Sequence, residues 1–281
     1  MELDPTILIT GGSGQVGRAL RAHLPSASFP PRSTLDITDL AAVRQATAGV
    51  SIVIHLAAMT NVDECERKPD VAHEINSVGT KNVVLAAQEQ SARVLYVSTD
   101  YVFDGKKPGE YSEDDEPRPI NVYGETKLEG ERHVASAPSN LVVRTSWVYG
   151  EGNNFVRAIL ATIPGRRSIS VVGDQRGRPT WANNLAASLA VLAAGTASGV
   201  VNVSDDGPVC SRAELAETIL RFRSSDVIVE PIMSNDYTDS SKKAVARRPV
   251  NSALSLARAR EMGLPVRDWR SSLNQYLRET S

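Results

Sequence analysis

Short apolar runs alternate with amphipathic stretches along the first half of the chain. Between the apolar runs, hydrophobic residues recur with the period of a helix that hides one face, which predicts helices over residues 15–23, 70–90 and 123–135. The apolar runs themselves are continuous and rich in Val, Ile and Leu, which predicts buried strands over residues 6–10, 52–56, 93–98 and 140–146. Continuous apolar strands separated by helices indicate βαβ units and a parallel sheet covered on both faces.

The pattern loosens after residue 150. Residues 183–194 and 211–223 predict helices, and residues 200–203 predict a short strand. Residues 173–179 have the composition of a loop, and residues 235–249 form a long polar stretch. Polar loops beside a rigid sheet are where binding surfaces are commonly built.

These elements predict an α/β protein with a doubly wound parallel sheet of the Rossmann type and a smaller C-terminal substrate-binding region. We expect residues 1–150 to form the Rossmann domain, completed by parts of residues 175–205. Residues 151–281 would mainly form the smaller region, without a clean boundary between the two parts.

The composition of the chain indicates the class of protein and excludes some partners. Hydrophobic residues make up 41% and charged residues 23%, as in a soluble globular protein. The formal net charge of -2 offers no basic excess for nucleic acid or an anionic membrane. No run approaches the ~18 apolar residues of a membrane span, and acids precede the first apolar run. We therefore expect a cytoplasmic protein with neither partner, and with Cys65 and Cys210 as free thiols that are buried or partly buried.

Three glycines, Gly11, Gly14 and Gly17, follow the first predicted strand and open the first predicted helix in the sequence TGGSGQVG. Their spacing is one residue longer than the usual dinucleotide fingerprint. At this junction, backbone N–H groups and the helix dipole meet the negative charge of a pyrophosphate. Glycine allows the backbone to approach the phosphate closely. The loop therefore predicts a dinucleotide site.

The residues near the expected adenosine ribose include features that favour NADH and features that favour NADPH. Asp36 lies 19 residues after Gly17, near the position where an acid holds the ribose 2′-hydroxyl of NAD. Arg32 and Ser33 lie just before it and could instead receive the 2′-phosphate of NADP. Both cofactors stay open at this stage.

A hydroxyl, a phenol and an ammonium form the candidate catalytic set. Tyr123 and Lys127 are four residues apart, so a helix places them on one face. A tyrosine in water has a pKa of ~10, and a nearby ammonium, together with an oxidised nicotinamide, would lower that pKa and make Tyr123 a proton donor and acceptor. Thr99, at the carboxyl end of the third strand, could hold a carbonyl oxygen by a hydrogen bond.

No competing site stands out. The four histidines have no metal-ligand spacing with one another, and His55, at a strand end, is typical of a buried core histidine; the other three are His23, His73 and His133. The P-loop motif of nucleotide kinases is absent from the sequence. The sequence therefore offers no rival to the Thr99–Tyr123–Lys127 set.

Taken together, these residues resemble the extended short-chain dehydrogenase/reductases and, within them, the dTDP-4-dehydrorhamnose reductase family. The blocks STDYVFDG at 98–105 and RTSWVYG at 144–150 are the specific ones. The other matching blocks run in order over nearly the whole chain: TGGSGQVG at 10–17, DITD at 36–39, HLAAMTNVDECE at 55–66, INSVGTKN at 75–82, YGETKLEGE at 123–131, NNF at 153–155, DQRGRPT at 174–180 and ARRPVNSAL at 246–254.

The resemblance implies roles for individual residues. It makes Thr99, Tyr123 and Lys127 the catalytic triad. Together with the motifs above, it assigns cofactor contacts to Gly11, Gly14, Gln15, Val16, Arg32, Asp36, Ile37, Ala57, Ala58, Thr60, Asn76, Ser98, Tyr123 and Lys127. It assigns substrate contacts to Thr99, Tyr101, Trp147, Asn154, Phe155, Arg178 and Arg248, where an arginine fork suits a diphosphate. Some relatives bind Mg²⁺ between subunits through glutamates, whereas Gln15 stands at the loop position here, so we expect no metal site.

The implied activity is the reduction of the C4 ketone of dTDP-4-dehydro-β-L-rhamnose by NADPH or NADH, with Tyr123 as proton donor and dTDP-L-rhamnose as product. Two alternatives stay open. One is a 4-ketoreductase for another dTDP-4-keto-6-deoxysugar, and the other is a non-catalytic regulatory subunit that resembles that of methionine adenosyltransferase. The resemblance also makes residues 1–150 the NAD(P)-binding domain and residues 151–281 mainly the nucleotide-sugar-binding region. The chain would be a monomer or a homodimer.

Overall fold

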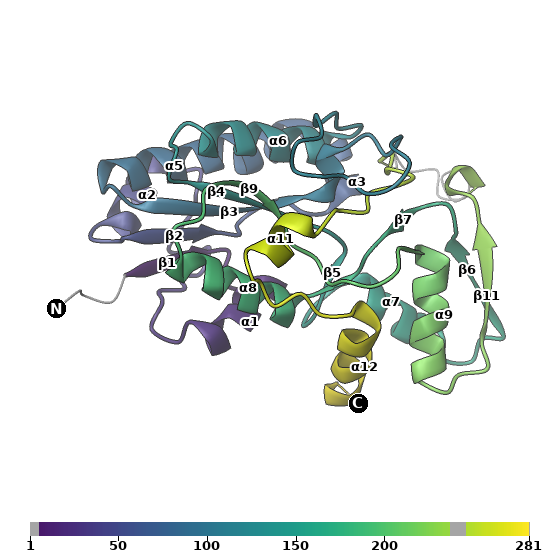
Figure 1. Cartoon of the computed structure of the whole chain (residues 1–281). Helices are drawn as coiled ribbons and strands as arrows, with labels where there is room; N and C mark the ends of the chain where they lie inside the picture. The colour runs from purple at the N-terminus through teal and green to yellow at the C-terminus, as the bar shows by residue number, and fades with distance from the viewer. Residues whose placement is uncertain (1–5, 237–245, 281) are drawn as a thin grey trace.

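A five-stranded parallel sheet forms the centre of the protein. The structure is a computed structural model that describes residues 6–236 and 246–280. The strands lie in the order β1-β2-β3-β4-β9, and Figure 1 shows them with helices on either side. Their bounds are β1 (Ile7–Thr10), β2 (Ile52–His55), β3 (Arg93–Thr99), β4 (Leu141–Thr145) and β9 (Gly199–Asn202).

The strands are largely apolar because both faces of the sheet are covered. Every residue of β2 and β4 is buried, as expected for central strands of a parallel sheet. On the free side of β1, Ser28 exchanges backbone hydrogen bonds with Ile7 and Ile9, at 2.8 Å each. The segment around Ser28 therefore extends the β1 edge of the sheet by one isolated β-bridge.

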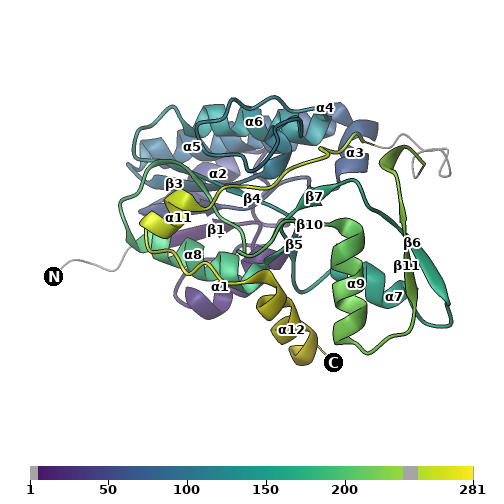
Figure 2. The same ribbon diagram turned by 45° about the vertical axis from the view of Figure 1, so that its right-hand side comes forward.

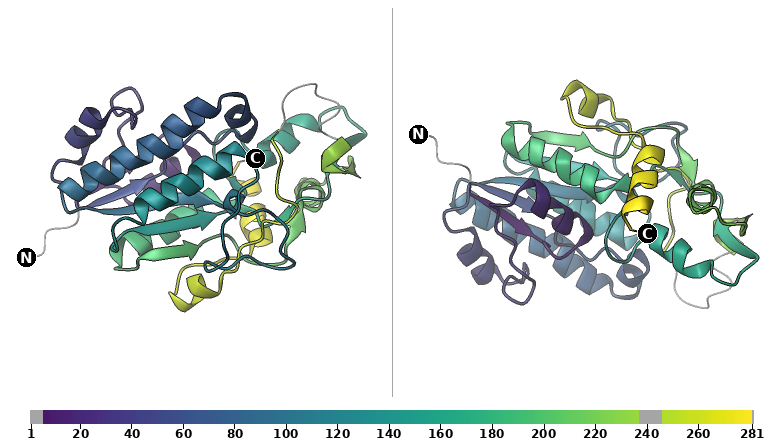
Figure 3. Two further views of the ribbon diagram at one scale, coloured as in Figure 1. Left: turned by 90° about the horizontal axis from the view of Figure 1, so that it is seen from above. Right: turned by 90° about the horizontal axis from the view of Figure 1, so that it is seen from below.

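Helices cover the two faces of the sheet. One face carries α2 (Leu40–Thr47), α5 (Gly79–Glu89) and α6 (Val122–Val134), and the other carries α1 (Gln15–His23) and α8 (Ala182–Ala194). The two views of Figure 3 look onto these opposite faces. Leu20 of α1 and Leu189 of α8 belong to one apolar core, whereas Val43 of α2 and Val83 of α5 belong to another. The predicted doubly wound parallel fold is confirmed.

The predicted helix over residues 70–90 is interrupted. It consists of α4 (Pro69–His73), one π-helical turn, η1 (Glu74–Val78), and α5. Inside the wide turn, Asn76 is fully buried and hydrogen-bonds the Met59 amide and carbonyl groups. A π-turn adds a residue to the helix and redirects its side chains, which the apolar periodicity of the sequence did not reveal.

The C-terminal region has an apolar core of its own. Parallel strands β6 (Ser168–Val172) and β11 (Ile228–Ile232) pair there, beside three helices. These helices are α7 (Phe155–Thr162), α9 (Arg212–Phe222) and α12 (Trp269–Glu279). Trp269, Leu273 and Ile219 are fully buried in this core. Figure 2 shows this group beside one end of the main sheet.

Several short elements join the two parts. The predicted loop at 173–179 contains β7 (Arg176–Gly177), which pairs antiparallel with β10 (Cys210–Ser211), and β5 (Val148–Tyr149) pairs with β8 (Thr180–Trp181). Short helices α3 (Val62–Arg67), η2 (Asp100–Val102) and α11 (Ala257–Glu261) complete the described chain. Most of the predicted polar stretch at 235–249 lies outside the described residues.

The cysteines and the helices bear on two expectations from composition. Cys65 and Cys210 are both buried free thiols, as expected. Across residues 6–236 and 246–280, none of the helices has the length and apolar character needed to cross a membrane.

Candidate active site

A cleft of about 750 Å³ opens at the carboxyl ends of the parallel strands. Gly11 follows β1, Leu56 follows β2, and Thr99 and Thr145 end β3 and β4. Ligands of doubly wound sheets bind at this edge. The cleft brings together most of the residues selected from the sequence: Gly11, Gly14, Gln15, Val16, Arg32, Asp36, Ile37, Ala57, Ala58, Thr60, Ser98, Thr99, Tyr101, Tyr123, Lys127, Trp147 and Asn154.

The glycine loop has the geometry of a phosphate cradle. Gly11 has a φ of +69°, and a Cβ there would lie 2.7 Å from the Ala57 nitrogen. A Cβ on Gly17 would lie 2.5 Å from the Gly12 Cα, so the helix can start this close to the loop only with glycine. No side chain caps the first turn of α1, which leaves its N–H groups available to an anion. These residues fit a dinucleotide pyrophosphate.

A segment of the C-terminal half crosses beside this loop. Asn154 donates a hydrogen bond from Nδ2 to Gln15 Oε1 at 3.2 Å, and its own oxygen accepts from the Arg157 amide to cap α7. Phe155, the next residue, packs against the C-terminal core and does not line the cleft. The structure therefore places Asn154, but not Phe155, against the expected cofactor site.

An acid and a guanidinium border the far end of the cleft. Asp36 accepts hydrogen bonds from the amide and hydroxyl of Thr38 at 3.0 and 2.8 Å, and these bonds lower the pKa of its carboxyl. Arg32 is exposed and lines the same end. Ile37 is buried against Gly79 of α5, where a Cβ would lie 2.7 Å from its Cδ1.

A buried hydrogen-bond chain holds the wall formed by residues 57–60. His55 contacts Thr10 Oγ1 through Nδ1 at 2.6 Å and Thr80 Oγ1 through Nε2 at 3.0 Å. Thr80 donates to the Asn76 carbonyl at 2.7 Å, and the Asn76 side chain binds Met59 on both its amide and its carbonyl. Asn76 does not line the cleft; it positions the segment that does.

The catalytic candidates come from two elements that meet closely. Thr99 ends β3, and Tyr123 and Lys127 lie on α6. A Cβ on Gly124 would lie 2.1 Å from the Tyr101 carbonyl oxygen, so glycine lets α6 approach the end of β3. The Tyr123 hydroxyl forms a hydrogen bond with the Thr99 side chain, and its ring meets Tyr101 edge-on at 5.8 Å. Lys127 Nζ donates to the Val97 carbonyl at 2.8 Å.

Burial shifts the pKa values of both titratable catalytic candidates. It raises the pKa of Tyr123, and the hydrogen bond with Thr99 opposes that rise only in part. Burial also lowers the pKa of Lys127 to about 7, against the attraction of Glu131. The expected lowering of the tyrosine pKa depends on an oxidised nicotinamide as well as on an ammonium, so it stays a prediction for the complex with the cofactor.

The opposite end of the cleft is aromatic and cationic. Trp147 lines it with a φ of +46°, a backbone conformation that few non-glycine residues adopt. Arg212, at the start of α9, also lines the cleft, and its guanidinium carbon lies 3.6 Å from the centre of a Trp147 ring. Sequence reasoning missed Arg212, because only the fold brings residues 147 and 212 together.

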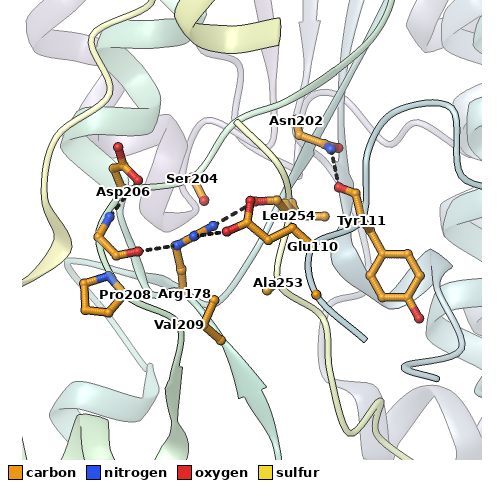
Figure 4. A network of polar contacts seen from close by, with 12 residues as sticks. Glu110, Tyr111, Arg178, Asn202, Ser204, Asp206, Pro208, Val209, Ala253 and Leu254 are labelled. Carbon is orange, nitrogen blue, oxygen red and sulfur yellow. Dashed lines mark hydrogen bonds and ion pairs between the residues drawn. The ribbon is translucent and has the colours of Figure 1, made fainter. Parts of the chain in front are cut away.

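The two arginines expected to contact the substrate, like Phe155, lie outside the cleft lining. Arg178 is 5% exposed and forms an ion pair with Glu110. It also donates to the carbonyls of Gly207 at 2.7 Å and Leu254 at 2.8 Å. Figure 4 shows this network of loops around the guanidinium. Arg248 forms an ion pair with Asp63 at 2.9 Å.

The described residues hold no group of three or more His, Cys, Asp or Glu side chains with the geometry of a metal site. The chemistry of the cleft is instead that of a glycine loop leading to a hydroxyl, a phenol and an amine. On this fold, that arrangement is the mark of an oxidoreductase of the extended short-chain dehydrogenase/reductase class.

Comparison with known proteins gives the family. Residues 5–281 match the family described as "RmlD substrate binding domain". The dTDP-4-dehydrorhamnose reductase of Mycolicibacterium smegmatis is 38% identical over 278 residues, which cover 95% of this chain and 83% of the relative. The chain therefore belongs to the RmlD family of NAD(P)H-dependent sugar-nucleotide reductases.

Two further relatives are informative. The structure of dTDP-4-dehydrorhamnose reductase from Bacillus anthracis in complex with NADP is 35% identical, with a TM-score of 0.91 over 99% of this chain and 100% of that one. The dTDP-4-keto-6-deoxy-D-glucose reductase of Streptomyces niveus is 34% identical over 95% of both chains.

Proposed function

We propose that this protein reduces the C4 ketone of dTDP-4-dehydro-β-L-rhamnose to give dTDP-L-rhamnose. The observation that carries the proposal is the convergence of Thr99, Tyr123 and Lys127 on one cleft that also contains the glycine loop. Relatives that bear the reductase name align over nearly the whole chain.

The cofactor of the proposed reaction is NADPH or NADH, which when bound supplies the hydride for C4. Gly11, Gly14 and the first turn of α1 would bind its pyrophosphate. Arg32 and Asp36 would face its adenosine ribose, and residues 57–60 would lie against the nicotinamide half. The complex of the Bacillus anthracis relative with NADP supports NADPH, and the exposed guanidinium of Arg32 suits a 2′-phosphate.

Tyr123 would give its proton to the C4 oxygen. Its raised pKa keeps the phenol protonated at neutral pH, as a proton donor requires. The Thr99 hydroxyl donates to the Asp100 carboxylate at 3.0 Å in this structure. Turned toward the substrate, it would hold the same oxygen and add a second donor where negative charge develops. Lys127, when charged, would stabilise the phenolate that remains.

A second candidate substrate is another dTDP-4-keto-6-deoxysugar, such as the 4-keto-6-deoxy-D-glucose compound. The Streptomyces niveus relative named for that substrate favours it. The chemistry at Tyr123 would be the same, and only the stereochemistry of the sugar ring would differ.

A coupled assay separates these candidates. dTDP-glucose is supplied with the upstream dehydratase and epimerase, oxidation of NADPH or NADH is followed, and the sugar product is identified. The proposal expects cofactor oxidation that needs both upstream enzymes, with dTDP-L-rhamnose as product. Oxidation that persists without the epimerase would favour the 4-keto-6-deoxyglucose substrate. No oxidation, together with stable co-purification of a partner enzyme, would favour a regulatory subunit.

A further inference from the structure

Arg212 extends from the C-terminal region into the cleft. It is the first residue of α9, and its guanidinium lies 3.6 Å from a Trp147 ring and 5.2 Å from the Phe155 ring. It also hydrogen-bonds the side chain of Tyr101. Two aromatic rings and a phenol therefore hold a planar cation in a fixed orientation at the wall of the cleft.

The charge of Arg212 is not matched by a close acid. Within residues 6–236 and 246–280, no ion pair of 4.0 Å or less involves it. Asp100 attracts it from farther away; one oxygen of that carboxyl accepts a hydrogen bond from Thr99 at 3.0 Å, and the other has no hydrogen-bond partner in the described chain. Arg248 hydrogen-bonds the same Tyr101 side chain and repels Arg212. A bound anion would relieve this repulsion, because it would be attracted to both guanidinium groups.

The position of Arg212 relative to the reacting group limits what it could bind. Tyr101 lies between Arg212 and Tyr123. Its ring is 5.8 Å from the Tyr123 ring, and its side chain hydrogen-bonds Arg212. Arg212 thus lies one aromatic residue beyond the proposed proton donor. A sugar with C4 at Tyr123 carries its diphosphate on C1, across the ring. The phosphates of the dinucleotide would lie at a different place, the glycine loop.

We propose that Arg212 binds the diphosphate of the nucleotide-sugar and thereby selects substrates that carry one. The inference rests on the proposed function for the placement of the sugar. The planar fork of an arginine donates two parallel hydrogen bonds to phosphate oxygens. Stacking on Trp147 fixes the direction of that fork before the substrate arrives, which reduces the ordering cost of binding.

The test compares Arg212→Gln and Arg212→Lys with the wild-type protein. Calorimetric titration measures the affinity for dTDP, thymidine and NADPH. Loss of a charged hydrogen-bond donor should weaken dTDP binding at least ~10-fold in Arg212→Gln, with thymidine and NADPH unchanged. Arg212→Lys keeps the charge but loses the planar guanidinium, so its affinity for dTDP should lie between those of the wild type and Arg212→Gln. In turnover, KM for the keto-sugar nucleotide should rise while kcat stays within ~3-fold.

Arg270→Gln is the matched control, because Arg270 also stacks on an indole, with its guanidinium carbon 4.9 Å from a Trp269 ring, but does not line the cleft. It should bind dTDP like the wild type. Unchanged dTDP affinity in folded Arg212→Gln, or an equal loss for thymidine, would overturn the inference. So would a fall in kcat without a rise in KM. If the protein reduces no keto-sugar nucleotide, the proposed function is wrong. The dTDP titration would still show whether Arg212 binds the diphosphate, because it does not depend on turnover.

Discussion

Tyr123 is the residue whose chemistry the proposed reaction needs most. Replacing it with phenylalanine keeps the ring that packs edge-on against Tyr101 but removes the proton. Tyr123→Phe should therefore lower kcat by at least ~10²-fold, the scale of general acid catalysis, with little change in NADPH affinity. Steady-state kinetics and a cofactor titration measure both quantities.

Tyr149→Phe is the control for that experiment, because Tyr149 is buried away from the cleft and its hydroxyl has no hydrogen-bond partner in the described chain. This variant should keep wild-type activity. Near-wild-type turnover of Tyr123→Phe would remove the phenol from the mechanism.

His55 is a single residue that should make stability depend on pH. Burial lowers its pKa from 6.5 to about 3, so between these values the unfolded chain binds a proton that the folded protein does not. The free energy of unfolding should therefore fall as pH drops below about 6.5, by up to ~1.4 kcal/mol per pH unit from this group.

Urea denaturation of wild type and His55→Gln at several pH values from 8 to 4.5 measures this dependence. The variant should be less stable at pH 8, because Thr10 and Thr80 lose their hydrogen-bond partner, and its stability should depend less on acid. Stability curves that stay parallel down to pH 4.5 would contradict this role of His55.

At the scale of elements, the close approach of α6 to η2 brings Tyr123 to Thr99. Gly124 allows it, because a Cβ there would lie 2.1 Å from the Tyr101 backbone oxygen. Gly124→Ala should push the helix away and lower kcat by ~10-fold or more, since a displacement of about 1 Å at a reacting group can cost ~10²-fold. Overpacking should also lower the free energy of unfolding by about 1–3 kcal/mol.

Gly195→Ala serves as the matched control for Gly124→Ala. Its Cβ would lie 3.6 Å from the Val191 carbonyl oxygen, an ordinary contact, and its φ of −96° suits any residue. Activity and thermal unfolding of both variants give the comparison. If Gly124→Ala retained full activity, the contact between α6 and η2 would not govern the placement of Tyr123.

Helices and strands whose hydrophobic residues form a clear run or repeat were predictable from the sequence. Elements without such a pattern were not. Helix α1 has the predicted bounds, and β2, β3 and β4 agree with the prediction to within a residue or so at each end. Strands β6 and β11 were missed because neither is a continuous apolar run: β6 alternates between buried and less buried residues, and β11 is mostly exposed. The π-turn at Glu74–Val78 was missed because Asn76, inside it, bonds to Met59, a contact outside the helix that periodicity does not report.

At the scale of the whole molecule, Arg178 connects loops from several parts of the chain (Figure 4). Arg178→Ala should lower the free energy of unfolding by roughly 2–4 kcal/mol, chiefly because the carbonyls of Gly207 and Leu254 lose a donor. The ion pair adds less, because the Glu110 side chain is 36% exposed and solvent screens it. At a temperature where the variant is folded, KM for the sugar nucleotide should be unchanged.

Arg118→Ala is the control, since Arg118 forms only an exposed ion pair with Glu116, and its loss should change stability by less than ~1 kcal/mol. Chemical denaturation and KM measurements on both variants decide the outcome. Normal stability of Arg178→Ala with a raised KM would instead support the substrate contact expected from the sequence.

The sequence by itself determined the parallel sheet, the glycine loop and the Thr99–Tyr123–Lys127 set, because these depend on local periodicity and short spacings. Only the tertiary structure decided that Arg212 lines the cleft while Arg178 and Arg248 do not, and that the pKa of Tyr123 is raised. The physical reason is that burial, stacking and electrostatic interaction depend on distances between groups far apart in the chain, and those distances exist only after folding.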